Sequence, residues 1–479
     1  MLSLARFQIQ LAYKWWVMLT VALGMLMSLM DSTIVNIAIP QMQRAFVASL
    51  HDVQWITTIY MITQAMVIPL APYLTSLLGS KRAYLWSLSS FLLGSLLCGF
   101  AWNLPSLVLF RCFQGIGGGV LLPMVMILQT QAFPYEERGR AGSMMGLVMM
   151  VAPTLGPFLG GYLIGSFGWQ WAFFINVPLG VIAVTLAQLV LKPTQGQAGT
   201  RFDRGGFLTS ACGIALLLYA APAMVSNGPT ILDTVLFGGS CLSLALFVVL
   251  EQRRARQGQM PLLNLRRFRD PTFTFSALTQ ILIFFVWFGV LFLLPIYLQT
   301  LHQETPLQAG LIQGAISLAT LVILPFGGWI ADRFSPRTAV IPGLLLLACA
   351  LAALMLLTLD TPIWLVVCLF LFLGMANGMT NQVNVAALSR IRQEEAEAIA
   401  HASTLLSVLR AAAAPLGVAI IASFVQRQSQ QIQQTLAGQG LSVAVLQRQS
   451  ELLALHTSFL LAAFLLLIAF GTMCCVPPR

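Results

Sequence analysis

Two oppositely charged residues lie inside long apolar stretches of the sequence. Asp31 falls within residues 15–39, and Arg111 falls within residues 105–132. Counted from the ends of these stretches, each is about seven or eight residues deep, or roughly 10–12 Å along a helix that rises about 1.5 Å per residue. The two side chains are therefore expected at the same depth, where they could meet.

A carboxylate and a guanidinium at this depth are suited to proton transfer. Burial favours the neutral form of a carboxyl group and a nearby cation favours its ionised form, so movement of the cation can load and unload a proton. Gln114 lies three residues after Arg111, on nearly the same helical face, where it could orient either partner. The alternative is a buried ion pair that only fixes helix packing.

The elements that carry these residues must cross a membrane. Hydrophobic residues make up 58% of the 479 positions and charged residues 8%, whereas soluble domains have about 25% charged residues. Apolar stretches near the roughly 20 residues needed to cross about 30 Å of hydrocarbon recur along the chain. Fourteen spans are predicted, over residues 15–39, 53–77, 83–101, 105–132, 141–166, 171–191, 207–225, 232–250, 273–299, 307–331, 338–358, 363–387, 399–425 and 457–476.

The basic residues orient these spans. With a cytoplasmic N-terminus, 20 of the 25 Lys and Arg residues fall on the cytoplasmic side and three on the outer side. This asymmetry is the positive-inside rule, and one missed span would scramble it. We therefore predict a multi-pass protein of the cytoplasmic (inner) membrane with both termini cytoplasmic. The net charge of +10 does not indicate nucleic-acid binding, because the basic residues lie in separate connections rather than on one surface.

The sequence does not favour an enzyme, a metal site or a bound cofactor. All eight cysteines fall in apolar segments, which is not the pattern of a disulfide framework or a zinc site. The four histidines are scattered. A glycine run at Gly115, Gly117 and Gly119 lies inside a predicted membrane helix without a preceding strand, so it indicates close helix packing rather than nucleotide binding. A proton gradient is then the expected energy source.

A repeated helix end indicates internal duplication. Residues 72–82 and residues 328–337 both place a basic turn just after an apolar helix, eight spans apart. Two six-helix halves with two helices inserted between them give this offset, and secondary transporters are commonly built in this way. The predicted parts are an N-terminal bundle over 1–191, two inserted helices with linkers over 192–272, and a C-terminal bundle over 273–479.

Four segments in order resemble the major facilitator superfamily, in its fourteen-helix drug:proton antiporter branch of the EmrB and QacA type. They are Leu29 to Pro40, Arg111 to Gly119, Ala152 to Gly161, and Trp169 to Gly180. The resemblance covers essentially the whole chain. It implies an all-α polytopic membrane protein with fourteen transmembrane helices, two six-helix bundles of the major facilitator fold plus two inserted helices.

The resemblance also implies roles for particular residues. Asp31 and Arg111 take part in proton coupling. A motif associated with antiporters lies where the halves touch, and its residues here are Pro153, Gly156, Pro157, Gly160 and Gly161. The family's acidic residue after the second helix is replaced by Ser76, and a glycine of the second copy by Ser335. Asp332, beside Arg333, is then the better candidate for a cytoplasmic charge latch.

Several polar and aromatic residues in the spans are candidates for substrate binding. The residues are Asn36, Gln114, Trp287, Asn377, Asn381 and Arg410. Asn377, Asn381 and Asn384 follow a spacing of four then three, which puts them on one helical face. Trp287 belongs to an aromatic helix, and its alternative is a lipid-facing or packing role. Gln114 has the alternative of joining helices by hydrogen bonding.

Three functions are consistent with these observations. The first is proton-coupled efflux of small hydrophobic or amphipathic compounds such as drugs. The second is transport of one metabolite, such as a lipid, peptide or siderophore, because fold does not fix substrate. The third is a non-transporting membrane sensor or assembly subunit. The Gln-rich residues 426–456 are predicted to form an exposed helical or flexible excursion on the outer side. In a host with two membranes, this excursion is a candidate docking site for a periplasmic adaptor protein that leads to an outer-membrane channel, and the alternative is a tether that only joins two helices.

Overall fold

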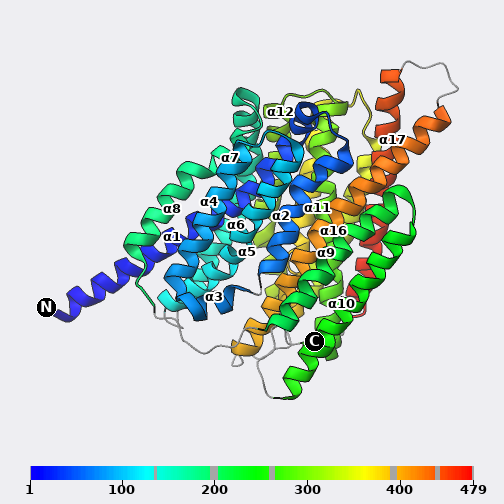
Figure 1. Cartoon of the computed structure of the whole chain (residues 1–479). Helices are drawn as coiled ribbons and strands as arrows, with labels where there is room; N and C mark the ends of the chain where they lie inside the picture. The colour runs from blue at the N-terminus through cyan, green and yellow to red at the C-terminus, as the bar shows by residue number, and fades with distance from the viewer. Residues whose placement is uncertain are drawn as a thin grey trace. The chain divides into compact units, whose positions relative to one another are not determined.

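The computed structural model of the chain describes residues 2–68, 70–133, 137–194, 203–257, 265–388, 396–436 and 443–476. Regular structure in these ranges is entirely helical (Figure 1). The chain divides into a first unit, Met1–Phe46 with Ile59–Asp203, and a second unit, Val47–Thr58 with Arg204–Arg479.

The first unit contains the helices up to α8, and α2 begins in the second unit. They are α1 (Leu2–Phe46), α2 (Leu50–Val67), α3 (Leu70–Leu78), α4 (Ser80–Gly99), α5 (Leu104–Ala132), α6 (Arg138–Phe167), α7 (Trp171–Phe174) and α8 (Asn176–Val190).

The second unit contains the remaining elements. They are α9 (Arg204–Asn227), α10 (Ile231–Arg256), η2 (Leu265–Arg269), α11 (Pro271–Ile296), the π-helical turn η3 (Tyr297–Leu301), α12 (Pro306–Arg333), α13 (Pro336–Ala353), η4 (Leu354–Leu356), α14 (Ile363–Thr380), α15 (Val383–Leu388), α16 (Ala396–Leu436) and α17 (Val443–Cys474).

Eleven helical segments in the described ranges are long and apolar enough to cross a membrane. The predicted all-helical polytopic fold is therefore confirmed, whereas the count of fourteen spans is not. The three predicted spans outside the eleven, 53–77, 83–101 and 141–166, fall on α2 with α3, on α4 and on α6. Helix α4 carries five serines and a Lys-Arg pair, and the α2 range is interrupted after 18 residues.

Three ranges that the sequence predicted as single helices are each divided. Helix α2 ends at Val67 and α3 begins at Leu70, on either side of the proline at position 69, which lacks the N–H that a helix interior needs. Ile175 separates α7 from α8, and residues 381–382 form a turn between α14 and α15. The span boundaries were therefore predicted better than the interruptions within them.

Capping side chains fix where several helices begin. Asn103 accepts a hydrogen bond from the backbone N–H of Ser106 at the start of α5, and Thr305 does the same at α12. Ser335, which stands where the family pattern has glycine, caps α13 in the same way through Thr338. Serine is a strong helix-capping residue, so this departure from the family pattern has a local structural role.

Glycines let α5 pack closely between α2 and α4. A Cβ atom on Gly117 would lie 2.4 Å from the backbone N of Phe91, and one on Gly94 would lie 2.5 Å from the Cα of Gln114. On the other side of α5, a Cβ on Gly119 would lie 2.6 Å from the carbonyl oxygen of Gln64. The close packing expected from this glycine run is confirmed.

In the second unit, the helices that the sequence predicted as an insertion pack with the later ones. Helix α9 contacts both α10 and α16, and α11 contacts α16. The α11–α16 crossing is close, because a Cβ on Gly417 would lie 1.9 Å from the carbonyl oxygen of Phe285. The division into 1–191, 192–272 and 273–479 stays a prediction.

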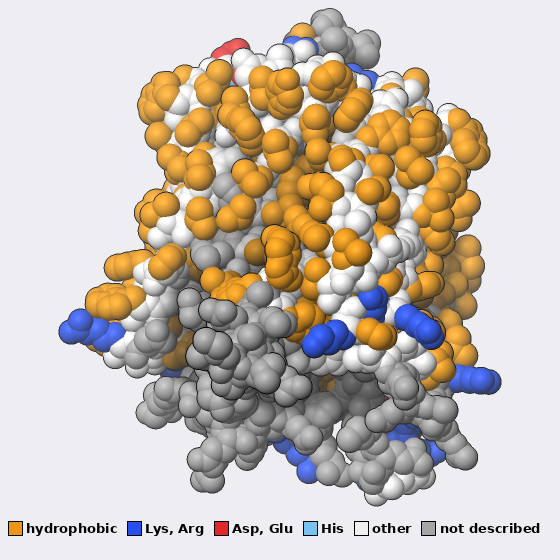
Figure 2. Space-filling model, turned by 90° about the vertical axis from the view of Figure 1, so that its left-hand side faces the viewer, with side chains coloured by type: hydrophobic (Ala, Val, Ile, Leu, Met, Phe, Trp, Pro, Cys, Tyr) orange, Lys and Arg blue, Asp and Glu red, His pale blue; other side chains and the backbone are white. Residues whose placement is uncertain are grey.

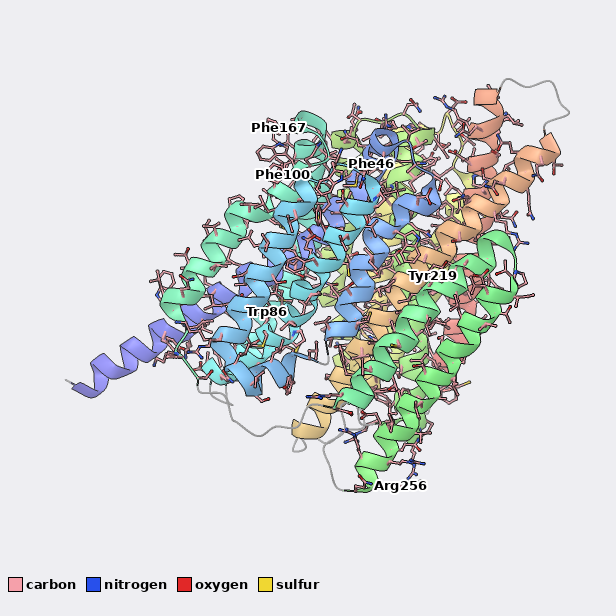
Figure 3. The ribbon with its side chains drawn as sticks, viewed as in Figure 1. Phe46, Trp86, Phe100, Phe167, Tyr219 and Arg256 are labelled. Carbon is pink, nitrogen blue, oxygen red and sulfur yellow. The ribbon has the colours of Figure 1, made fainter. Side chains whose placement is uncertain are left out.

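The surface is consistent with a lipid environment. Hydrophobic side chains dominate the face in Figure 2, and the Lys and Arg side chains visible there lie mostly near its lower edge. Within the first unit, Phe46, Phe100 and Phe167 lie near the same end of their helices (Figure 3). Their rings contact Trp169, Phe174 and Trp171 at 5.1–5.3 Å between centroids. Aromatic residues commonly gather at a membrane–water interface.

Candidate functional site

A buried ion pair joins α1 to α5 in the first unit. The Arg111 Nη1 donates to Asp31 Oδ2 at 2.6 Å, and both side chains are fully buried. The Gln114 Oε1 accepts a second bond from the same Nη1 at 2.7 Å, and the Gln114 Nε2 donates to Asp31 Oδ1 at 2.9 Å. The contact expected between Asp31 and Arg111 is therefore present, and Gln114 bridges the two partners.

The network extends to α4 and to the start of α8. The Asn176 Nδ2 donates to Asp31 Oδ1 at 2.9 Å and also lies 3.0 Å from Ser95 Oγ. The Ser95 hydroxyl in turn donates to the backbone oxygen of Phe173 at 2.9 Å. Four helices that are distant in sequence thus meet through one carboxylate.

Aromatic rings flank the guanidinium of Arg111. Its central carbon lies 4.0 Å from the Tyr60 ring centroid and 5.5 Å from that of Phe173. The Tyr60 hydroxyl accepts a hydrogen bond from Gln64 Nε2 at 2.7 Å. A cation held over aromatic faces keeps part of its stabilisation when its counter-ion changes, so Arg111 has support that is independent of Asp31.

The arrangement is suited to an ionised carboxylate, because all three recorded partners of Asp31 donate to it. A proton on Asp31 would require one of these donors to turn away, since a protonated carboxyl group has a donor of its own. Binding of a proton would therefore change how α1 is held to α5 and α8.

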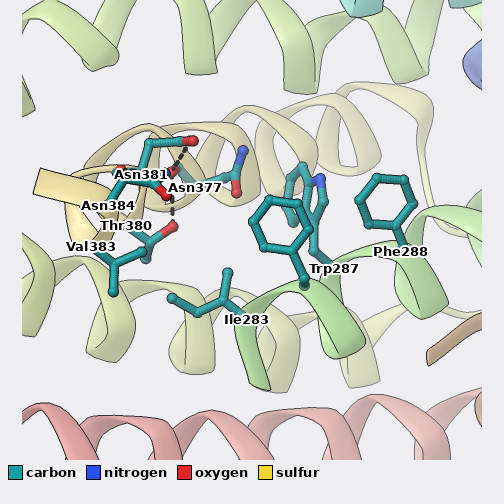
Figure 4. A pocket seen from close by; sticks show the side chains of 9 residues that line it. Ile283, Trp287, Phe288, Asn377, Thr380, Asn381, Val383 and Asn384 are labelled. Atoms are coloured by element: carbon teal, nitrogen blue, oxygen red, sulfur yellow. Dashed lines mark hydrogen bonds between the residues drawn. The ribbon is translucent and has the colours of Figure 1, made fainter. Parts of the chain in front are cut away.

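A second group of predicted residues lines a cavity of about 180 Å³ in the second unit. Helix α11 contributes Phe284, Trp287 and Phe288, and the end of α14 contributes Asn377 and Asn381 (Figure 4). The complete lining is Ile283, Phe284, Trp287, Phe288, Asn377, Thr380, Asn381, Val383 and Asn384. The sequence thus identified residues that share one cavity although they lie on different helices.

Arg410 on α16 borders this cavity. Its Nη1 donates to Asn384 Oδ1 at 3.3 Å, and its Nη2 donates to Ser407 Oγ at 2.9 Å. The guanidinium carbon lies 5.6 Å from the Phe284 ring centroid. Gln280 also donates to Asn384 Oδ1. Because Asn384 and Phe284 both line the cavity, the guanidinium contacts two residues of the cavity wall.

The residues of the antiporter motif pack α6 against α1 within the first unit. A Cβ atom on Gly156 would lie 1.9 Å from Thr33 Oγ1, and one on Gly160 would lie 3.1 Å from a methyl carbon of Ile34. Pro157 and Gly161 are buried, and the side chain of Pro153 is outside the described part. The close approach recorded for this motif is with α1, and its predicted place between the two halves stays a prediction.

The remaining predicted residues lie apart from both groups. Asn36 is buried in α1, one and a half turns beyond Asp31. Arg333 is exposed at the end of α12, where its guanidinium lies 5.4 Å from the Trp329 ring centroid. The Asp332 side chain is outside the described residues, so the charge latch stays a prediction.

Sequence reasoning did not select Asn176, Ser95 or Tyr60 as site residues. Asn176 stands within the segment Trp169 to Gly180 that carried part of the family resemblance, and an asparagine inside an apolar segment was the available signal. Ser95 and Tyr60 gave no signal, because serine and tyrosine are common in membrane helices and only the fold brings them to the ion pair.

Comparison with known protein families gives a match over most of the chain. The family model described as Major Facilitator Superfamily matches residues 21–418. The chain belongs to the Major Facilitator Superfamily. As a facilitator it is a transporter rather than an enzyme.

The curated relatives of this facilitator include transporters with different names. An uncharacterized MFS-type transporter, YhcA, of Bacillus subtilis is 32% identical over 83% of this chain and 74% of its own length. A multidrug resistance protein B homolog of Mycobacterium tuberculosis is 34% identical over 69% of this chain and 61% of its own length. The riboflavin transporter RibZ of Clostridioides difficile is 29% identical over 86% and 88% of the two chains.

Solved structures support the same fold for this facilitator. A bacterial homolog of the human lysosomal transporter Spinster, in an inward-facing and unoccupied conformation, aligns over 97% of this chain and 98% of its own with a TM-score of 0.70 at 16% identity. The xylose transporter XylE of E. coli aligns over 98% and 100% with a TM-score of 0.61 at 13% identity. At these identities the likeness concerns the fold alone.

Proposed function

We propose that this facilitator is a proton-coupled antiporter that exports small hydrophobic or amphipathic compounds, such as drugs, from the cytoplasm. The observation that carries the proposal is the fully buried Asp31–Arg111 pair with its Gln114 and Asn176 partners. Buried ionisable groups in membrane helices usually mark ion or substrate pathways. Relatives named as multidrug resistance proteins support export of drug-like compounds.

In this proposal Asp31 is the proton site. In the conformation described above, Arg111, Gln114 and Asn176 all donate hydrogen bonds to its carboxylate. When α1 and α5 shift relative to one another, the carboxylate loses a donor and takes up a proton, and the return movement releases it. Because several helices meet at this carboxylate, its protonation state is linked to the conformation of the first unit.

The membrane topology proposed with this function has fourteen spans, cytoplasmic termini and a location in the cytoplasmic membrane. It rests on the distribution of Lys and Arg among the connections, with 20 residues on one side and three on the other. Cysteine labelling of the two ends of the chain in intact and opened cells tests it. Labelling of either end from outside intact cells would contradict this topology.

A second candidate is transport of one defined metabolite, such as a lipid, peptide or siderophore. The relative named as a riboflavin transporter favours this candidate, because its alignment covers more of both chains than that of the multidrug relative. Both candidates use the same fold, so only substrate range separates them. Export of chemically unrelated dyes would favour the first candidate, and export of one compound would favour the second.

The helical end of the hairpin formed by α16 and α17 is proposed as the contact for a periplasmic adaptor protein. Helix α16 continues to Leu436 and α17 begins at Val443, and the hydroxyl oxygens of Ser429 and Ser450 lie 3.3 Å apart between them. Shortening the hairpin in a host with two membranes should lower drug resistance. Unchanged resistance at equal protein level would remove the adaptor from the proposal.

Reconstituted vesicles test antiport directly. An imposed pH gradient, inside acidic for protein inserted with its cytoplasmic side outward, should drive accumulation of Nile red or anilinonaphthalene sulfonate, and a protonophore should abolish it. The Asp31→Asn protein should bind and release the dyes without accumulating them. Accumulation by wild type without a gradient, or by Asp31→Asn at the wild-type rate with one, would contradict proton antiport through Asp31.

A further inference from the structure

The cavity between α11 and α14 combines aromatic faces with hydrogen-bond donors. Phe284, Trp287 and Phe288 give one side of the lining, and three asparagines give the other (Figure 4). The backbone oxygen of Asn377 accepts hydrogen bonds from Asn381 and Thr380. The side-chain amide of Asn377 has no partner among the described residues, so its two N–H groups are available to a ligand.

Arg410 adds an unbalanced positive charge at the edge of this cavity. A guanidinium has five N–H groups, and the two recorded bonds of Arg410, to Asn384 and Ser407, leave three without a partner among the described residues. None of the ion pairs in the described ranges involves Arg410. The lining residues described above include no Asp or Glu.

Aromatic rings alone would also suit a cation, which is attracted to their faces. Here the Phe284 face is already occupied by the guanidinium at 5.6 Å. A second cation in the cavity would be repelled by Arg410, with no carboxylate among the described lining residues to compensate, and such repulsion is strong where water is scarce. An anion would instead supply the missing counter-charge and accept the unused N–H groups.

We propose that this cavity binds planar aromatic compounds that carry an anionic group, such as an aryl carboxylate. The ring would lie against Trp287 and Phe288, and the anionic group would accept hydrogen bonds from Arg410 and Asn377. The inference rests on the proposed function, because it takes the cavity as the place where the exported compound binds. It names the substrate class that the proposed export function leaves open.

Three probes with the same ring separate charge from shape: naphthoate, naphthamide and naphthylmethylammonium. Binding to the full-length protein in phosphatidylcholine nanodiscs is measured at equilibrium, without a gradient. Naphthoate should bind at least about tenfold more tightly than the neutral amide, and the ammonium should bind most weakly. Equal or tighter binding of the ammonium to the wild-type protein would overturn the proposal without any variant.

Substitution of Arg410 tests the assigned contact. Arg410→Gln keeps hydrogen bonding and most of the packing but removes the charge, so naphthoate affinity should fall about tenfold to the level of naphthamide, while naphthamide affinity stays unchanged. Arg427→Gln is the matched control, because Arg427 is on the same helix and donates to the backbone oxygen of Val225. Naphthoate affinity unchanged by Arg410→Gln would overturn the proposal.

Two further measurements distinguish binding in this cavity from lipid binding and from proton antiport. Adding phosphatidylglycerol should leave naphthoate affinity unchanged, whereas competition would show that the guanidinium faces a lipid headgroup and would overturn the proposal. Binding that depends on Arg410 without proton-driven accumulation in vesicles would leave this site standing and reject antiport. Proton-driven export with preferred binding of the ammonium would support antiport and reject this anion site.

Discussion

Replacing Asp31 with Asn removes the carboxylate from the buried network while keeping the shape of the side chain. The carboxylate accepts hydrogen bonds from Arg111, Gln114 and Asn176. An asparagine has one oxygen and an NH₂ group, so at least one of these donors would face another donor. The fully buried guanidinium would also lose its counter-charge.

Breaking a buried ion pair by removing one partner costs about 3–5 kcal/mol. The cation over the Tyr60 ring at 4.0 Å offsets a small part of this, on the order of 1–2 kcal/mol for a desolvated contact. We therefore expect Asp31→Asn to lower the free energy of unfolding by roughly 1–4 kcal/mol. The variant should still fold, but its free energy of unfolding should be lower than that of a variant with a surface substitution.

A double variant separates lost charge pairing from lost shape. Asp31→Asn with Arg111→Gln removes both charges and leaves amides that can hydrogen-bond to each other. Replacing both members of a buried pair is often close to neutral, so the double variant should be more stable than Asp31→Asn alone. Asp360→Asn is the control, since Asp360 is exposed and surface changes usually stay within about 0.5 kcal/mol.

The measurement is denaturant unfolding of the purified protein in detergent, followed by circular dichroism and fitted for the four proteins with a common slope. Asp31→Asn with the stability of wild type would show that the guanidinium does not depend on the carboxylate. A double variant less stable than Asp31→Asn would show that charge pairing is not the origin of the loss. Either result would refute the reasoning.

Three further changes test neighbouring contacts. Gly156→Val should slow export by a correctly inserted protein, because the added Cβ would fall within 2 Å of a side-chain oxygen on α1 and would push the two helices apart. The control is Gly314→Val, since a Cβ added at Gly314 would have no neighbouring atom within 4 Å. This control should export normally in the same dye assay. Arg111→Lys should reduce export about tenfold or more, since an ammonium does not reproduce the planar guanidinium that lies over the Tyr60 ring while it bonds Asp31; full activity would show that charge alone suffices. Asn176→Leu should lower the free energy of unfolding by about 1–3 kcal/mol through the lost bond to Asp31, and an unfolding midpoint equal to wild type would place Asn176 outside the network.

Depth counting from the sequence anticipated the central contact, because membrane thickness and helix rise fix how far Asp31 and Arg111 lie from the surface. The same argument says nothing about rotation around a helix axis. For that reason Asn176 and Ser95, which complete the network from other helices, required the fold. The family pattern contained Asn176, but a pattern does not say which residue its side chain meets.

The helix interruptions were less predictable than the helices themselves. The proline at position 69 is a visible reason for the break between α2 and α3, whereas the turn at residues 381–382 has no proline or glycine to mark it. Hydropathy averages over about 20 residues, so it identifies a span and passes over a turn of two residues. That turn matters, because it places Asn381 and Asn384 on the wall of the cavity.

The unbalanced charge of Arg410 has a consequence for energetics across the membrane. If the proposed antiport exchanges one anionic cargo for one proton, one negative charge leaves the cell while one positive charge enters, so both movements transfer charge in the same direction. Each elementary charge that crosses a potential of 100 mV changes the free energy by about 2.3 kcal/mol, and the two together give about 4.6 kcal/mol per cycle. Export would then be electrogenic and would continue on the membrane potential alone after the pH gradient has been dissipated.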